Sequence, residues 1–307
     1  RGKQTLELMQ TYRGGDNAKF WNGYIRNRMT QDDRAAYEKH KSGTMALQPF
    51  YENAMDDMSA AFFKNLTGEV PAFYKGVGSY PTLATTQNKL MFDNDSTTFY
   101  HNGRSQETGD WVGADLGAVR KIREVKILQG RNSVDDVDYF DNTILEASAD
   151  GKTWKALTGE LAKTYIIHWK GEPVDARYVR IRKLQSDKKS WIAVREFMVN
   201  PTTPESLPFT VSATNTEAAM FGFDKNPCTS FKSEGKLTFG VEAGKTSYTM
   251  LLDVKPNSGV KFNQYNKKGK LLSSTEIDNS FFTTTLTKGA VKAEIEGNVE
   301  VFEIIAK

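Results

Sequence analysis

Two segments near the start of the chain have apolar residues at the spacing of an amphipathic helix. Residues 16–43 open with Asp16 or Asn17 as a candidate N-cap and end at Gly43. They carry apolar residues at helical intervals, namely Phe20, Tyr24 and Met29. The stretch ALQPFYENAMDDMSAAFFKNL continues this pattern. We therefore expect residues 1–75 to form a helical bundle or spacer. Two or three such helices cannot bury a large core alone, so the spacer would pack on another domain.

The pattern changes to short alternating runs from about Thr82 onward. Runs such as EVKIL and YVRIRKL alternate apolar and polar residues, with ADG as a tight turn, and this predicts antiparallel strands in a sandwich or barrel. A Pro/Thr/Ser-rich linker at residues 201–208 separates two such regions. We expect one β-domain over residues 76–200 and a second, smaller and diverged β-sandwich over residues 209–307.

An internal repeat links the two β-rich regions. MFDNDSTTFYHNGR in the first resembles GFDKNPCTSFKSEGK in the second, ADLG resembles LLDV, and AVREFMV resembles EVFEIIA. The matched positions pair Asp93 with Asp224, Asp95 with Asn226, Thr98 with Thr229, and Glu196 with Glu303. Three matches in the same order favour a duplicated β-module.

Composition excludes several classes of protein. The chain has 307 residues, 38% of them hydrophobic and 26% charged, and a formal net charge of +3. Its basic residues are interleaved with acids rather than gathered, so we expect no nucleic-acid partner. No apolar run approaches the roughly 20 residues of a membrane span. Cys228 is the single cysteine and permits no internal disulfide. Because the sequence starts at Arg1 without an initiator methionine, we expect it to be part of a longer precursor.

The repeated loop carries oxygen ligands of the kind that calcium prefers. The spacing Asp-x-Asp/Asn-x-x-Thr, with a glutamate on the last strand, offers carboxylates, a hydroxyl and backbone carbonyls. Asp93 and Thr98 could bind a cation, and Glu196 could complete its coordination. The alternative is an Asx-turn, in which Asp93 accepts backbone N–H groups and no metal is bound.

Residues 82–201 resemble a discoidin domain (coagulation factor 5/8 type C), the fold of carbohydrate-binding module family 32. The stretches that carry this resemblance are FDNDSTTFYHN, GDWVGADLG, VRKIREVKIL, LEASADGKTWKAL, ARYVRIR and AVREFMV, in that order. The resemblance implies a jelly-roll β-sandwich with a structural calcium ion held by Asp93, Asp95, Thr98 and Glu196. Whether the last region also holds calcium is left open.

The helical segment and this module together are similar to the C-terminal part of bacterial glycoside hydrolase family 84 proteins. The stretches that carry this similarity are LQPFYENAMDDMSAAFF and DDVDYFDNTILEASADG. These are β-N-acetylglucosaminidases (O-GlcNAcases, often labelled hyaluronidases). The resemblance covers only the region C-terminal to their catalytic (β/α)8 barrel. It implies that the catalytic residues lie in a missing domain of the same chain and that residues 1–307 are not themselves catalytic.

A sugar site on a β-sandwich needs an exposed aromatic ring and a few polar side chains in neighbouring loops. The candidates are Tyr100, His101, Arg131, Asn132 and Trp191. We assign Tyr139, Phe140, Trp111 and Trp154 to packing.

The sequence therefore predicts an accessory region of a secreted, periplasmic or cell-surface bacterial glycosidase. Its expected partners are host glycans carrying N-acetylglucosamine or galactose. Two alternatives remain: a structural or dimerisation scaffold that binds no sugar, and an adhesin-type binding module.

Overall fold

The computed structural model describes residues 64, 70–72, 74–84, 86–131, 138–185, 190–226, 229–254, 257–278 and 281–307. Almost all of the predicted helical segment at residues 1–75 lies outside these residues and stays a prediction. The rest of the chain divides at Pro71/Ala72 and at Pro201/Thr202. We call residues 72–201 the middle unit and residues 202–307 the last unit. None of the described helices is both long and apolar enough to cross a membrane.

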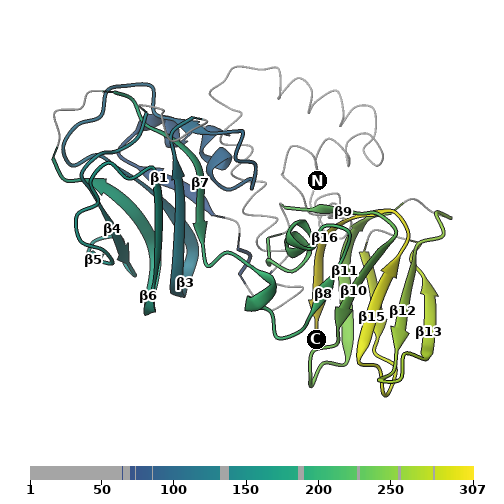
Figure 1. Cartoon of the computed structure of the whole chain (residues 1–307). Helices are drawn as coiled ribbons and strands as arrows, with labels where there is room; N and C mark the ends of the chain where they lie inside the picture. Colours follow the sequence, from purple (N-terminus) through teal and green to yellow (C-terminus); the bar gives the residue numbers. More distant parts are fainter. Residues whose placement is uncertain are drawn as a thin grey trace, which may run out of the picture. The chain divides into compact units, whose positions relative to one another are not determined.

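The middle unit is built from antiparallel strands and two short 3-10 helices (Figure 1). Its sheet has the strand order β2-β7-β3-β6-β4-β5, and β1 pairs with β3. The elements are β1 (Lys75–Gly78), η1 (Pro81–Ala84), η2 (Thr86–Met91), β2 (Tyr100–His101), β3 (Trp111–Gln129), β4 (Thr143–Ser148), β5 (Lys155–Ala156), β6 (Ile166–Lys183) and β7 (Ala193–Val199).

The two long strands β3 and β6 lie side by side (Figure 1) and belong to both layers of the sandwich. Their pairing is interrupted between Asp115 and Arg120 and again between Ile122 and Glu124. Before these interruptions β3 pairs with β1, and after them it pairs with β7. Irregularities of this kind bend a strand, so each long strand can pass from one layer to the next.

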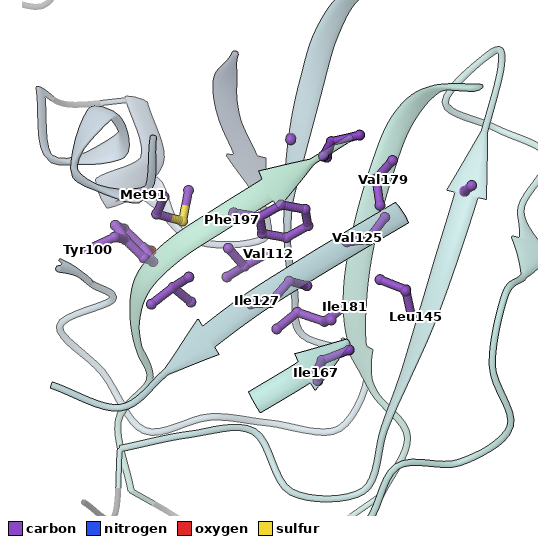
Figure 2. Packing of buried hydrophobic residues seen from close by; sticks show 14 of the residues in the cluster. Met91, Tyr100, Val112, Val125, Ile127, Leu145, Ile167, Val179, Ile181 and Phe197 are labelled. Carbon is purple, nitrogen blue, oxygen red and sulfur yellow. The ribbon is translucent and has the colours of Figure 1, made fainter. Parts of the chain in front are cut away.

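The core of the middle unit lies between these layers (Figure 2). Alternation along β3 buries Val112, Val125 and Ile127, which meet Phe197 from β7 and Ile181 from β6. Burying a side chain of this size stabilises the fold by about 1.5–3 kcal/mol. The period-two pattern read from the sequence therefore identifies the buried face correctly.

The last unit consists of two separate antiparallel sheets, with strand orders β13-β12-β15-β10-β8 and β14-β11-β16-β9. Its elements are η3 (Pro204–Ser206), β8 (Val211–Ser212), α5 (Thr216–Ala219), η4 (Met220–Gly222), β9 (Phe231–Ser233), β10 (Lys236–Gly240), β11 (Ser247–Asp253), β12 (Lys261–Tyr265), β13 (Leu271–Glu276), β14 (Phe281–Thr285), β15 (Lys292–Glu296) and β16 (Val299–Ala306). A second hydrophobic core fills it, with Phe239, Phe262 and Ile295 among its buried residues.

The two units have the same strand topology. The order β8-β10-β15-β12-β13 matches β1, the first half of β3, the second half of β6, β4 and β5. The order β9-β16-β11-β14 matches β2, β7, the second half of β3 and the first half of β6. The last unit therefore repeats the fold, with each long bent strand divided in two.

This topology corrects one match within the sequence repeat. LLDV lies in β11, where Leu251 is opposite Glu303. In the middle unit Leu128, from the stretch KILQ, is opposite Glu196. The start of LLDV, Leu251 and Leu252, therefore corresponds to Leu128 and Gln129 at the end of KILQ rather than to ADLG. The pattern of apolar residues alone could not distinguish two strands of similar composition. The predicted β-sandwich fold is confirmed for the described residues.

Candidate functional site

The loop that precedes β2 is closed by the side chains of Asp93 and Thr98. Asp93 Oδ1 accepts a hydrogen bond from the backbone N–H of Asp95 at 3.0 Å, and its Oδ2 accepts one from Thr98 Oγ1 at 2.7 Å. Between them Asn94 has a φ of 58°, in the left-handed region that asparagine tolerates well. These contacts form an Asx-turn that also directs carboxylate and hydroxyl oxygens toward each other.

Glu196 on β7 is buried next to this loop. It is 3% exposed, and neither of its carboxylate oxygens has a hydrogen-bond donor in bonding geometry among the described residues. Burial, followed by the negative charge of Asp93, raises the pKa of Glu196 to about 9. Burial also raises the pKa of Asp93. A buried carboxyl group next to a half-buried one is relieved of repulsion by a shared proton or by a cation.

The donor set fits a hard divalent cation. Asp93 and Glu196 supply carboxylates, and Thr98 and nearby backbone carbonyls supply neutral oxygens. The Asp95 carboxylate is instead exposed and accepts hydrogen bonds from the N–H and Oγ1 of Thr97. The part of Asp95 that bonds to Thr98 is its backbone carbonyl, which accepts from Thr98 Oγ1 at 3.1 Å. In the described part of the chain no three His, Cys, Asp or Glu side chains gather as a metal site. A cation here would therefore depend on two carboxylates and several neutral oxygens.

The last unit repeats the loop almost bond for bond. Asp224 accepts from the N–H of Asn226 at 2.8 Å and from Thr229 Oγ1 at 2.7 Å, and Lys225 has a φ of 60°. Burial raises the pKa of Asp224. Glu303 on β16 is 1% exposed, at the place that Glu196 takes on β7. The duplicated motif therefore has the same local structure in both units.

His101 and Trp191 form an aromatic pair on the surface of the middle unit. Their ring centroids are 4.5 Å apart, with an interplanar angle of 56°. Trp191 is 45% exposed, whereas His101 is half-buried. An exposed indole held by a second ring offers the flat apolar surface on which one face of a sugar can stack.

Arg131 and Asp138 are near enough to this pair for both of their charges to affect the pKa of His101. Arg131 Nε is 3.0 Å from Asp138 Oδ2. Burial lowers the pKa of His101, the charge of Asp138 raises it, and the charge of Arg131 lowers it further. His101 is therefore largely neutral near pH 7 and can donate or accept a hydrogen bond with a hydroxyl group.

Buried polar side chains fix the two loops that carry the aromatic pair. Gln106 Nε2 donates to the carbonyl of Tyr139 at 2.9 Å and lies 3.4 Å from the carbonyl of Trp191. Asn102 Oδ1 accepts from the backbone N–H of Ile192 at 3.0 Å. Sequence reasoning missed Gln106, Asn102 and Asp138. Isolated amides and one acid among four in a loop give no recognisable spacing.

The remaining candidates are distributed as follows. Tyr100 is completely buried, and its hydroxyl lies 2.9 Å from Thr82 Oγ1, so contrary to expectation its ring belongs to the core beneath the surface. The alternation of β2 explains this, because consecutive residues point to opposite faces. Asn132 lies outside the described residues.

The aromatic residues assigned to packing are buried or enclosed. Tyr139 is 9% exposed and Phe140 is fully buried. Trp111 and Trp154 are partly buried, with ring centroids 6.0 Å apart, and the guanidinium carbon of Arg180 lies 5.2 Å from the ring centre of Trp111 and 3.6 Å from that of Trp154. They belong to a cation–π cluster rather than to the surface around Trp191.

Residues 78–197 match the family model of the F5/8 type C domain. No curated protein matches the chain. Among solved structures, the chain is similar to a CBM32 module from Clostridium perfringens in complex with GalNAc-β-1,3-galactose, with 17% identity, 41% of this chain and 94% of that chain covered, and a TM-score of 0.33.

Two further solved structures are similar to the same extent. One is the family 32 module of Clostridium perfringens NanJ in complex with galactose, with 16% identity, 41% and 92% of the two chains covered, and a TM-score of 0.33. The other is chitosan-binding module 2 of a Paenibacillus chitosanase/glucanase in complex with chitotriose, with 15% identity, 42% and 97% covered, and a TM-score of 0.35. The family match lies within the middle unit, and residues 78–197 are therefore an F5/8 type C domain.

Proposed function

We propose that the middle unit binds a glycan at the surface formed by His101, Trp191 and Arg131. The observation that carries this proposal is the indole of Trp191, which is 45% exposed although the loops around it are held by buried hydrogen bonds. An exposed ring costs free energy in water, and a sugar face stacked on it would recover part of that cost. His101 and Arg131 would bind hydroxyl groups at the edge of the ring.

The last unit supports this reading because the shared fold does not require the aromatic pair. Lys232 follows Phe231 in β9 as His101 follows Tyr100 in β2, and both preceding residues pair with the last strand. Asn298 precedes Glu303 by the same interval as Trp191 precedes Glu196. The same topology therefore forms with a lysine and an asparagine at these two positions, so structural need does not explain the rings.

The proposed ligands are glycans that carry N-acetylglucosamine or galactose. Titration calorimetry of the whole chain against both monosaccharides and their disaccharides should give millimolar or tighter binding. Trp191→Ala and His101→Ala should abolish it. Leu271→Ala, at a residue that is 47% exposed in the last unit, is the matched control and should bind as well as the unaltered protein.

If no sugar of this panel binds detectably, the glycan-binding proposal is wrong. In that case a scaffold role becomes the better explanation, and sedimentation of the chain would show whether it dimerises.

We also propose that Asp93, Thr98 and Glu196 hold a structural calcium ion. The buried carboxylate of Glu196 and the nearby carboxylate of Asp93 support this, because among the described residues Glu196 has no donor in bonding geometry and a cation would remove the repulsion between two ionised groups. The ion would join the loop before β2 to the last strand of the domain. Calcium titration after treatment with a chelator should show binding that Glu196→Gln removes.

Finally, we propose that the chain is an accessory region of a secreted bacterial β-N-acetylglucosaminidase of glycoside hydrolase family 84. The sequence resemblance of residues 1–200 is the support for this. The middle unit would then keep the enzyme near glycan and raise the local substrate concentration, even with weak binding. Sequencing the region that encodes the residues before Arg1 tests it directly. A barrel with two neighbouring aspartates is the expected result, and a region without a hydrolase would favour an adhesin-type protein.

A further inference from the structure

The loops around the proposed sugar site share one attachment point on β7. The backbone N–H of Gly130 donates to the carbonyl of Ala193 at 2.9 Å, and the N–H of Ala193 donates to the carbonyl of Asp138 at 3.1 Å. Ala193 is also the register partner of His101. Arg131, Asp138 and His101 are therefore held around a single residue of a central strand.

Arg131 and Asp138 differ in how firmly the fold holds them. The side chain of Asp138 is 11% exposed, whereas that of Arg131 is 50% exposed. Their ion pair at 3.0 Å uses the Nε of the guanidinium, one of its five N–H donors. Because the guanidinium is planar, a bond at Nε fixes the plane in which the other nitrogens lie.

The charges of this ion pair affect the pKa of His101, which belongs to the aromatic pair. Among the causes that shift the pKa of His101, the charges of Asp138 and Arg131 follow burial and oppose each other. Both charges therefore act at the position of the imidazole ring. Removing Asp138 would leave the positive charge of Arg131 acting on His101 without its counterion.

We propose that Asp138 is a positioning residue of the glycan site, which fixes the direction of the Arg131 guanidinium beside the ring of His101. This proposal rests on the proposed glycan-binding function. Its physical content is preorganisation. A guanidinium already held in one orientation loses little conformational freedom when a hydroxyl group binds, whereas a free arginine side chain would have to be ordered at the expense of affinity. Asp138 itself need not touch the sugar.

A double-mutant cycle on the whole chain tests the proposal. Galactose and N-acetylglucosamine are the probes, and the four proteins carry Asp138→Ala, Arg131→Ala, both changes or neither. Asp138→Ala should weaken binding roughly tenfold when Arg131 is present and less than twofold when it is absent, since charge-assisted hydrogen bonds have that order of effect. Asp175→Ala, which removes an exposed ion pair with Lys121, is the matched control and should leave affinity unchanged.

Equal weakening by Asp138→Ala in both backgrounds would overturn the positioning role while leaving glycan binding intact. No binding by the unaltered protein would instead remove the proposed function and the role that depends on it. Asp138→Glu keeps the charge and should recover part of the affinity. Thermal unfolding of each variant identifies any that fails to fold.

An NMR measurement examines the ion pair without any sugar. The ¹⁵N relaxation of the Arg131 Nε–H group should report a rigid side chain in the unaltered protein and in Asp175→Ala, and a mobile one in Asp138→Ala. If Arg131 is equally rigid without Asp138, the positioning proposal is wrong whatever the sugar titrations show.

Discussion

The carboxyl group of Glu196 should make the metal-free middle unit less stable as the pH rises. Its pKa in the folded protein is raised from the ordinary 4.5 to about 9, by burial first and by Asp93 second. Between these two values the folded protein keeps a proton that the unfolded chain has released. Each pH unit in this window therefore lowers the free energy of unfolding by about 1.4 kcal/mol. From pH 5 to pH 7 the loss from this one proton is at most about 2.7 kcal/mol, because the unfolded glutamate still holds part of its proton at pH 5.

Calcium should cancel this dependence. The ion binds the ionised carboxylates, so its binding releases the shared proton and becomes tighter as the pH rises. Stability in millimolar calcium should then change little between pH 5 and pH 7. The stabilisation that calcium provides should be small at pH 5 and should grow with pH. For a domain of this size the difference at pH 7 corresponds to roughly 8 to 12 °C in melting temperature.

Tryptophan fluorescence can follow this unfolding selectively. The middle unit contains Trp111, Trp154, Trp169 and Trp191, the last unit contains no tryptophan, and Trp21→Phe removes the fifth. Urea unfolding at pH 5 and pH 7, in a chelator and in calcium, gives the four free energies that are needed. Glu196→Gln is the control: it should flatten the pH dependence in the chelator and lose the response to calcium.

Two outcomes would refute this reasoning. One is a metal-free protein whose middle unit becomes more stable between pH 5 and pH 7. The other is a Glu196→Gln variant with the same pH slope and the same calcium response as the unaltered protein.

Three further predictions concern stability. Gly113→Ala should destabilise the middle unit by about 2 kcal/mol or more, since its Cβ would lie 2.3 Å from the carbonyl oxygen of Val179, whereas Gly159→Ala, with no atom within 4 Å, should change the urea midpoint little. Glu146→Ala should cost about 3 kcal/mol, because it leaves two arginines that donate to Glu146 without their carboxylate partner. The lowered pKa of Glu146 means that its contribution is present above its ordinary pKa and is lost on acidification, so a deficit that persists at low pH contradicts this. Lys225→Gly should stabilise the last unit by up to about 1 kcal/mol and so raise its melting temperature, because the φ of 60° at this position suits glycine. A lower melting temperature would contradict this prediction.

The fold could be predicted from sequence where alternation was regular and failed where strands bend. EVKIL and YVRIRKL predict strands correctly because one face of each is buried. The sequence does not show that residues 111–129 form one strand, β3, that passes between layers. That property depends on the pairing interruptions near Asp115 and Ile122, the first of which contains Gly117 with a φ of 75°. A single glycine within an apolar run does not show from the sequence alone that the strand continues beyond it.

Parts of the site whose residues lie close together in the sequence could be predicted, and parts whose residues lie far apart could not. The loop from Asp93 to Thr98 is recognisable because its contacts span five residues at most. Trp191 and His101 are ninety residues apart in the chain, and only the β2–β7 pairing brings them together. Tyr100 was misplaced because an aromatic next to a histidine in sequence lies on the opposite face of a strand.

Comparison of the two units separates the residues that the fold needs from those that it does not. Both units contain the hydrogen bond from a Thr to the loop Asp, which joins Thr98 to Asp93 and Thr229 to Asp224. Both also have a buried Glu on the last strand. A feature kept in both copies of one topology is explained by what the copies share, which is the joining of an early loop to the last strand. His101 and Trp191 occur in one copy only, where Lys232 and Asn298 stand in the other. Architecture alone therefore accounts for the loop but not for the aromatic pair, and the proposed glycan binding would account for that difference between the two units.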